Sequence, residues 1–129
     1  MSRRDSQSAY RFGNLFILIN DKGIIVINTI AHTLKHIAFK DLNIFIQPFD
    51  TNQKCVFVNN TYQISVPNYL LIFNAGFELI EKHPFPEALE IHHAFKDSRG
   101  HIWACSFKKG IFLYTAAQLR TLYYLKGKK

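Results

Sequence analysis

The stretch DSRGHIWACSFKKGIFLY, residues 97–114, decides the fold class that this sequence predicts. It contains two apolar segments, and a turn-forming sequence with a glycine precedes each of them, at Gly100 and at Gly110. Glycine adopts a positive φ angle without a Cβ penalty, and a chain that reverses direction between two strands often needs that angle. The stretch therefore predicts a β-hairpin with both glycines in turns at positive φ.

The layout of this hairpin also occurs near the start of the chain, in residues 13–27, GNLFILINDKGIIVI. Gly13 corresponds to Gly100 and Gly23 to Gly110, and both offsets are 87 residues, since 100 − 13 = 110 − 23 = 87. Half of this offset is about 43 residues, and a period of about 40–45 residues with four strands in each unit is typical of β-propeller blades. The sequence therefore predicts a third copy between the two.

A weaker copy lies half-way along the chain. Residues 50–53 precede the apolar segment 54–59 in the way that residues 97–100 precede theirs. The segments 34–37, 77–80 and 119–122 form a second matched set, apolar at their first and fourth positions. We therefore predict an all-β fold, a partial β-propeller of three four-stranded antiparallel blade-like units, in a single domain over residues 1–129 with units of about 8–40, 41–86 and 87–125.

Individual strands follow from the apolar runs between turn residues. In the first unit, residues 14–20 and 23–30 are expected to form the central hairpin, because both are continuously apolar and suit a sheet that is covered on both faces. The second unit is expected to begin with a strand at 42–49, to place 54–59 second and to contain one extra turn, and the third is expected to begin at 89–95. Residues 116–124 are expected to form a turn and a strand rather than an amphipathic helix, because their register matches the second set.

Composition and charge restrict the class of protein. Hydrophobic residues make up 48% of the chain and charged residues 19%, so the chain is too apolar to be disordered. The formal net charge of +7 permits an anionic partner, and nucleic-acid binding is an alternative function, although the basic residues are scattered or lie at the ends. Residues 1–10 show no secretory signal, and polar residues at 20–23 interrupt the apolar run 15–30, so no membrane span is expected.

The two cysteines, Cys55 and Cys105, are predicted to lie in corresponding strands of the second and third units. Free cysteine is commonly a small buried residue, and we favour that interpretation. The sequence leaves a disulfide between the two open.

A group of histidines suggests a metal site, because His92, His93 and His101 lie close to Cys105 in the sequence. Adjacent residues of one strand point to opposite faces, however, so at most one of His92 and His93 can join His101. The spacing also fits none of the structural zinc patterns. We therefore predict no metal site.

Catalytic chemistry is not indicated by the acidic residues. Glu78 and Glu81 are three residues apart, as are Glu87 and Glu90, and on a strand that spacing sends the two carboxylates to opposite faces. A solvated surface is the favoured interpretation for both pairs. The serines lack the surroundings of a hydrolase nucleophile, and the chain contains no glycine-rich phosphate loop. We predict no enzyme and no cofactor, and we assign no catalytic or ligand-binding residue.

The residues of the opening stretch also carry a resemblance to a known family. Asp97, Gly100, Ile102 and Trp103, together with residues 110–114, fit the pattern Asp-x-x-Gly-x-(Ile/Leu)-Trp followed by Gly-(Leu/Ile)-x-x-Tyr. The third unit thereby resembles the two-component regulator propeller repeat. The first unit keeps both glycines but has Phe16 and Ile27 at the two aromatic positions, and the second unit lacks the glycines. In this alignment Phe16 and Val56 are the counterparts of Trp103, so packing between blades is favoured for Trp103 over stacking on a sugar or a base.

The resemblance implies the sensory part of a bacterial hybrid histidine kinase, in which a ring of periplasmic blades recognises a ligand, often a glycan breakdown product. The chain would then be a non-catalytic ligand-sensing module, and part of a larger propeller, because closed rings have roughly four to eight blades. Three units leave two blade faces uncovered, so we expect further blades or a second copy of the chain to cover them, and the isolated chain to self-associate. A structural protein–protein interaction module is the third functional hypothesis.

Overall fold

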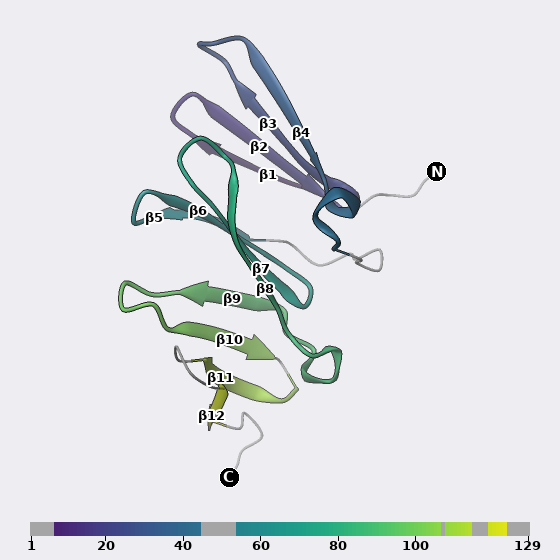
Figure 1. The fold of residues 1–129 in the computed structure, drawn as a ribbon, viewed down its shortest axis with the longest axis vertical. Coiled ribbons are helices and arrows are strands. Elements are labelled where there is room, and N and C mark those ends of the chain that lie inside the picture. The colour runs from purple at the N-terminus through teal and green to yellow at the C-terminus, as the bar shows by residue number, and fades with distance from the viewer. Residues whose placement is uncertain (1–6, 45–53, 107, 115–118, 124–129) are drawn as a thin grey trace. The chain divides into compact units, whose positions relative to one another are not determined.

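The computed structural model describes residues 7–44, 54–106, 108–114 and 119–123, and the chain divides into two compact units, Met1–Gln53 and Lys54–Lys129. Its regular structure consists of twelve strands and two short 3₁₀ helices, and the described residues contain no α-helix. The strands form three four-stranded sheets in which neighbouring strands are antiparallel and follow the chain order (Figure 1). The predicted all-β fold of three four-stranded antiparallel units is confirmed.

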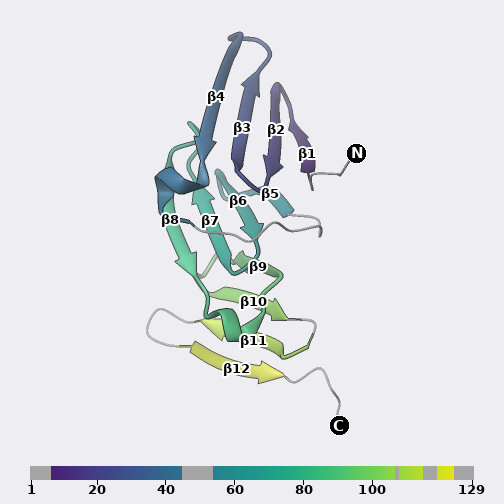
Figure 2. The same ribbon diagram turned by 90° about the vertical axis from the view of Figure 1, so that its right-hand side faces the viewer.

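Sheet 1 consists of β1 (Gln7–Phe12), β2 (Leu15–Asn20), β3 (Gly23–Asn28) and β4 (Thr33–Ala38), which lie side by side in Figure 2. The predicted central hairpin is therefore confirmed as β2 and β3. Its two faces differ in burial: Ile17, Ile19 and Ile24 are fully buried on one face, whereas Phe16 on the opposite face is 38% exposed. We call the face that contains Phe16 the open face of sheet 1.

Glycine has two different roles in the predicted turns. Gly100 and Gly110 have φ angles of 86° and 105°, which confirms their expected role as turn residues at positive φ. Gly23, the counterpart of Gly110, is not among the residues with positive φ. A Cβ at Gly23 would instead collide with the backbone oxygen of Ile37 in β4. Gly23 is thus needed because β4 approaches closely, while the Asn20 side chain shapes the turn by accepting hydrogen bonds from the N–H groups of Lys22 and Gly23.

Sheet 2 consists of β5 (Lys54–Val58), β6 (Thr61–Val66), β7 (Tyr69–Phe73) and β8 (Leu79–Pro84). The sequence predicted the segment 54–59 as the second strand of its sheet, and this is wrong, because β5 is the first strand. The two-residue turn between β5 and β6, Asn59-Asn60, has φ angles of 52° and 61°. Asparagine adopts this left-handed conformation more readily than other non-glycine residues. What looked like an extra turn is the regular opening turn of the sheet, with asparagine where the other units have glycine.

The other boundaries predicted for the second unit also change. The strand predicted at 42–49 is wrong where the structure describes it, because Phe39–Leu42 is a 3₁₀ helix, η1, and Asn43 has a φ of 59°. Residues 45–53 lie outside the described part of the chain. Phe77 is buried in the loop between β7 and β8 at a φ of 62°, so the last strand begins at Leu79 and not at Phe77.

Sheet 3 consists of β9 (His93–Lys96), β10 (Ile102–Ser106), β11 (Gly110–Tyr114) and β12 (Leu119–Tyr123). The predicted hairpin of the opening stretch is confirmed as β10 and β11. β12 confirms a strand rather than a helix at 119–123, and the turn predicted at 116–118 lies outside the described residues. The predicted first strand at 89–95 is too early, because Glu87–Leu89 is a 3₁₀ helix, η2, and Glu90 has a φ of 52°.

The first two sheets end in the same way, which reveals a repeat that the glycines did not show. The Phe39 N–H donates to the backbone oxygen of Lys22 at 3.0 Å, and the Phe85 N–H donates to the backbone oxygen of Asn68 at 2.9 Å. Both donors and both acceptors are 46 residues apart, since 85 − 39 = 68 − 22 = 46. The opening turns at Gly13 and Asn59 share this offset, since 59 − 13 = 46. The second sheet therefore repeats the first at an offset of 46 residues and without an insertion. The sequence had predicted an offset of about 43 residues and an extra turn.

Sheets 2 and 3 share an apolar core within the second compact unit. Leu70 and Ile72 of β7 pack in one cluster with Ala94, Ala104 and Phe112 of sheet 3, and Phe85, Ile91 and Ile102 complete it. Directly opposed residues of antiparallel strands share a face, so the face of sheet 2 that contains Leu70 and Ile72 is the face that meets sheet 3.

Candidate functional site

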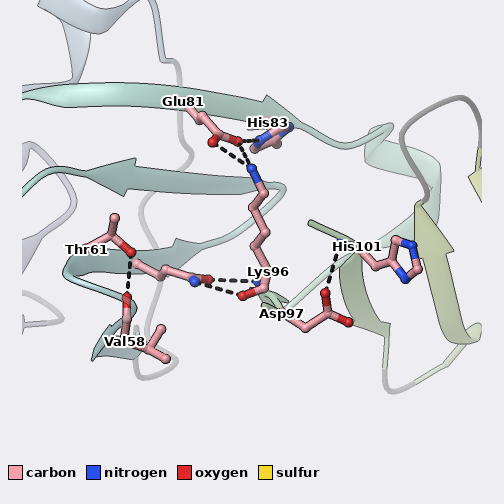
Figure 3. Close-up of polar contacts among 8 residues, drawn as sticks. Val58, Thr61, Glu81, His83, Lys96, Asp97 and His101 are labelled. Carbon is pink, nitrogen blue, oxygen red and sulfur yellow. Dashed lines mark hydrogen bonds and ion pairs between the residues drawn. The ribbon is translucent and has the colours of Figure 1, made fainter. Parts of the chain in front are cut away.

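A small polar hollow lies between sheet 2 and sheet 3, and we call it the crevice. Its volume is about 170 Å³ and it is open to solvent. Amide, hydroxyl, carboxylate and ammonium groups line it together with two isoleucines: Asn59, Thr61, Gln63, Ile72, Ile80, Glu81, Lys96 and Asp97. Figure 3 shows Lys96 of sheet 3 reaching Glu81 of sheet 2, whereas Thr61 and Asp97 bond to Val58 and His101.

The register of sheet 2 brings three of the lining residues together. Gln63 in β6 is paired with Ile72 in β7, and Ile72 is paired with Glu81 in β8. Because paired residues share a face, these three form a row across the sheet on the side that meets sheet 3. Residues far apart in the sequence thus form one wall of the crevice.

Glu81 is the centre of an ion-pair group at one end of the crevice. The Lys96 Nζ atom lies 2.8 Å from Glu81 Oε1 and 2.6 Å from Oε2, and the His83 Nε2 atom lies 2.6 Å from Oε1 (Figure 3). Partial burial raises the pKa of Glu81, but the hydrogen bonds from Lys96 and His83 and the charges of these groups outweigh burial, so its pKa is lowered from the ordinary value of 4.5. Glu81 therefore stays ionised and is already bound by cationic or hydrogen-bonding groups.

Two buried polar side chains of sheet 2 bind the outer edge of β9. The Gln63 side chain donates from Nε2 to the Lys96 oxygen at 2.9 Å and accepts from the Lys96 N–H at 2.8 Å. The Ser65 hydroxyl accepts from the Ala94 N–H at 2.8 Å. β9 is an edge strand, and an edge strand has backbone groups that no neighbouring strand satisfies. Gln63 and Ser65 satisfy three of these groups, which explains why these two polar side chains are buried.

The loop between β9 and β10, residues 97–101, is held together by one carboxylate. Asp97 Oδ1 accepts hydrogen bonds from the N–H groups of Arg99 and His101 at 2.9 Å, and Asp97 Oδ2 accepts from the indole Nε1 of Trp103 at 3.0 Å. These bonds explain why aspartate and tryptophan stand six residues apart in the motif. The bond from Trp103 is the largest cause that lowers the pKa of Asp97, and the backbone N–H groups of His101 and Arg99 add to it against slight desolvation.

Trp103 does not lie on the face of sheet 3 that packs against sheet 2. It is paired with Phe95 and Leu113, whereas Ala104 next to it belongs to the shared core. Its predicted counterpart Val56 lies in β5, the first strand of sheet 2, so the alignment of these two residues is wrong. The role of Trp103 that the contacts establish is to hold the Asp97 loop.

The tyrosine that ends the motif contributes to the shared core. The Tyr114 ring lies edge-on to Phe85, with ring centroids 5.2 Å apart. Its hydroxyl is buried, and it has no hydrogen-bond partner in the part of the chain that the structure describes. Burial raises the pKa of Tyr114, so the hydroxyl stays protonated.

The histidines considered for a metal site are not brought together. His93 is paired with Cys105 across β9 and β10, but His101 lies in the Asp97 loop, where its N–H binds Asp97. Among the described residues, no three histidine, cysteine, aspartate or glutamate side chains form a group that could hold a metal ion.

The acidic pairs differ from the prediction in one member. Glu78 is exposed and accepts a hydrogen bond from Asn74, and Glu87 lies exposed in η2. Glu81, predicted to be a solvated surface residue, is instead part of the ion-pair group in the crevice. No local pattern indicates its partner Lys96, which is 15 residues away. The burial of Gln63 and Ser65 was also missed, because polar and apolar residues alternate along β6 and such alternation is typical of a strand with one solvated face.

The two cysteines are free and do not occupy corresponding strands. Cys55 lies in β5, the first strand of sheet 2, and Cys105 lies in β10, the second strand of sheet 3. Cys55 is buried as predicted, and burial raises the pKa of its thiol to about 12. Cys105 is only half-buried.

The crevice offers hydrogen-bond donors and acceptors rather than an activated nucleophile. Glu81 is held by Lys96 and His83, and Asp97 is held by its own loop, so both carboxylates already have partners.

No helix of the described residues is long and apolar enough to cross a membrane. Comparison of the chain with protein-family models, with curated proteins and with solved structures finds no match.

Proposed function

We propose that the protein is a non-catalytic ligand-binding module whose three sheets are blades of a partial β-propeller. Three successive sheets of the same strand order support this proposal, as does the packing of sheet 2 on sheet 3 through one apolar core. In the family that the third unit resembles, such modules are periplasmic sensors, and the same role is proposed here.

The observation that carries the proposal is the polar lining of the crevice. Asn59 lines the crevice with an amide, the Thr61 hydroxyl donates to the Val58 oxygen and can still accept a hydrogen bond, and Lys96 has one ammonium hydrogen beyond its two bonds to Glu81. Ile72 and Ile80 present apolar surface beside them. A volume of about 170 Å³ is smaller than the roughly 300 Å³ at which sites for drug-sized ligands begin. We therefore propose a neutral ligand with several hydroxyl groups and the size of a single ring, such as one unit of a glycan fragment.

The open face of sheet 1 supports the second part of the proposal. Phe16 and Leu34 are large apolar side chains that are 38% and 67% exposed on this face. Further blades or a second copy of the chain would bury them, and burial of apolar area is worth about 25 cal/mol per Å². The module would then act as part of a larger assembly.

The ligand proposal can be tested by filling the crevice without disturbing its ion pairs. Saturation-transfer NMR with glucose, galactose and xylose at millimolar concentration should show contact with the wild-type protein. Ile80→Trp should abolish this signal, because Ile80 lines the crevice and is half exposed. Ile30→Trp is the matched control, since Ile30 is an exposed isoleucine in the turn between β3 and β4. Equal signals from Ile80→Trp and the wild type, or no signal from any sugar, would contradict the proposal.

A further inference from the structure

The outer edge of β4 is an open strand edge. β4 is the last strand of sheet 1, so one side of its backbone faces no other strand of that sheet (Figure 1). Its first four residues, 33–36, are all exposed, and Leu34 is 67% exposed. The ladders of sheet 1 contain no register shift, and β4 contains no proline. Such an edge is able to accept another strand.

Two other edges in the molecule are protected. β8 ends in Pro84, and the ladder beside it has a register shift between Ile72 and Phe73. The outer edge of β9 is satisfied by Gln63 and Ser65. Proline, bulges and covering side chains are the usual devices that prevent strand addition. In the part of the chain that the structure describes, β4 has no proline and no register shift. Its one edge lysine, Lys35, disfavours a basic strand but attracts an acidic one.

The charge around β4 indicates the kind of strand that this edge accepts. Between Asp21 and Asp41 the chain has three lysines, two histidines and no acidic residue. Lys35 and His36 are adjacent in β4 itself. Like charges opposite each other destabilise a strand pair, and opposite charges stabilise it. A second copy of β4 is therefore a poor partner, and a strand with acidic residues is a good one.

The open face of sheet 1 indicates the apolar part of the partner. Phe16 is paired with Ile27, and Ile27 is paired with Leu34, so the three side chains form a row that ends at β4. A residue of an added strand next to Leu34 would extend this row. An apolar side chain at that position would cover Leu34, as a cross-strand pair does in any sheet.

We propose that the outer edge of β4 is a docking site for an extended segment of a partner protein, in which acidic and apolar residues alternate. The segment adds a fifth strand to sheet 1 through backbone hydrogen bonds, which is a common mode of peptide recognition. Its apolar residues lie on the face of Leu34 and His36, and its carboxylates lie on the opposite face, near Lys35. This proposal is independent of the ligand proposed for the crevice.

Hydrogen exchange with a synthetic peptide tests the proposal directly. The probe is an end-capped peptide of about eight residues in which glutamate and valine alternate, long enough to cover a strand of ordinary length. Two controls accompany it: the same peptide with lysine in place of glutamate, and the acidic peptide with a central proline. The acidic peptide should slow amide exchange in residues 33–38 by about tenfold or more, and neither control should do so.

Variants of the protein separate charge from apolar contact. Lys35→Glu should remove the protection and Lys35→Gln should weaken it, whereas Lys40→Glu, an exposed lysine outside β4, should leave most of it. Leu34→Ser should weaken binding more than Ile30→Ser, because Ile30 is exposed outside the ladder. Circular dichroism of each variant confirms that sheet structure is retained.

Three results would overturn the proposal. The first is no protection of residues 33–38 by the acidic peptide at millimolar concentration. The second is equal protection by the lysine peptide, since charge then has no part in recognition. The third is protection that rises with protein concentration alone, which would assign the edge to a second copy of the chain.

Discussion

Sheets 2 and 3 have the same strand order but open with different turns. Sheet 2 uses two residues, Asn59 and Asn60, whose backbones both adopt positive φ. Sheet 3 uses the longer loop from Asp97 to His101, where Gly100 takes the positive φ and the Asp97 carboxylate binds the loop. One topology is thus specified by backbone preference in one sheet and mainly by side-chain hydrogen bonds in the other. The difference predicts which substitutions each sheet tolerates.

The largest effect is expected where the two sheets meet. Gln63→Ala should lower the free energy of unfolding by about 2–3 kcal/mol, because it removes two hydrogen bonds and leaves partly buried backbone groups of Lys96 without these partners. Urea denaturation would measure this change. Asn74→Ala is the matched control, since the Asn74 amide makes exposed hydrogen bonds to Glu78 and its loss should cost less than about 1 kcal/mol. Equal losses from the two variants would show that Gln63 does not join the sheets.

An intermediate effect is expected from the turn residues themselves. Gly100→Ala should cost about 1–2 kcal/mol, because alanine is strained at a φ of 86° although a Cβ there meets no atom within 4 Å. Asn60→Gly should change stability by less than about 0.5 kcal/mol, because glycine accepts the same φ and loses more entropy on folding. Denaturation of both variants under the same conditions compares the two turns. A large loss from Asn60→Gly would mean that the asparagine side chain, and not its backbone, specifies the turn.

The smallest effect is a dependence of sheet 3 on pH. The pKa of Asp97 is lowered from 3.8, so its carboxylate stabilises the fold above the unfolded pKa and this stabilisation is lost as pH falls through the folded pKa. The chain has one tryptophan, and Trp103 binds this carboxylate, so its fluorescence reports the loss. At pH values below about 4, the urea concentration at the midpoint of denaturation, followed by tryptophan fluorescence, should decrease. Asp97→Asn should flatten this dependence, and an unchanged slope in that variant would assign it to another group.

The sequence was sufficient for the all-β class and for the central hairpins of the first and third sheets. Gly13, Gly100 and Gly110 are turn residues as predicted, because positive φ is a local property that glycine reveals. The second sheet was misaligned because Asn59-Asn60 fulfils the same backbone requirement without glycine. The strand predicted at 42–49 failed over residues 42–44, because apolar residues do not distinguish a strand from the segment around η1, where Phe39 and Ile44 are also buried.

The crevice was beyond sequence reasoning for a different reason. The contact of Glu81 with Lys96 and that of Gln63 with Lys96 depend on how two sheets pack, and a one-residue change in register would send these side chains to opposite faces. Local patterns fix the strands but not the pairs of residues that meet across sheets. The spacing rule for Glu78 and Glu81 assumed that both lie in one strand, whereas Glu78 lies in the loop before β8 and Glu81 lies in β8, facing the neighbouring sheet.

The binding of β9 by Gln63 and Ser65 also has a consequence for the order of synthesis. Gln63 and Ser65 precede their backbone partners in β9 by 33 and 29 residues, so β6 leaves the ribosome first. Sheet 2 can form its own ladders before β9 is made, but the edge of β9 stays bonded to water until sheet 2 is in place. The direction of translation therefore supplies the template before the strand that needs it, and a nascent chain is protected from pairing β9 wrongly while the rest of sheet 3 is still being synthesised.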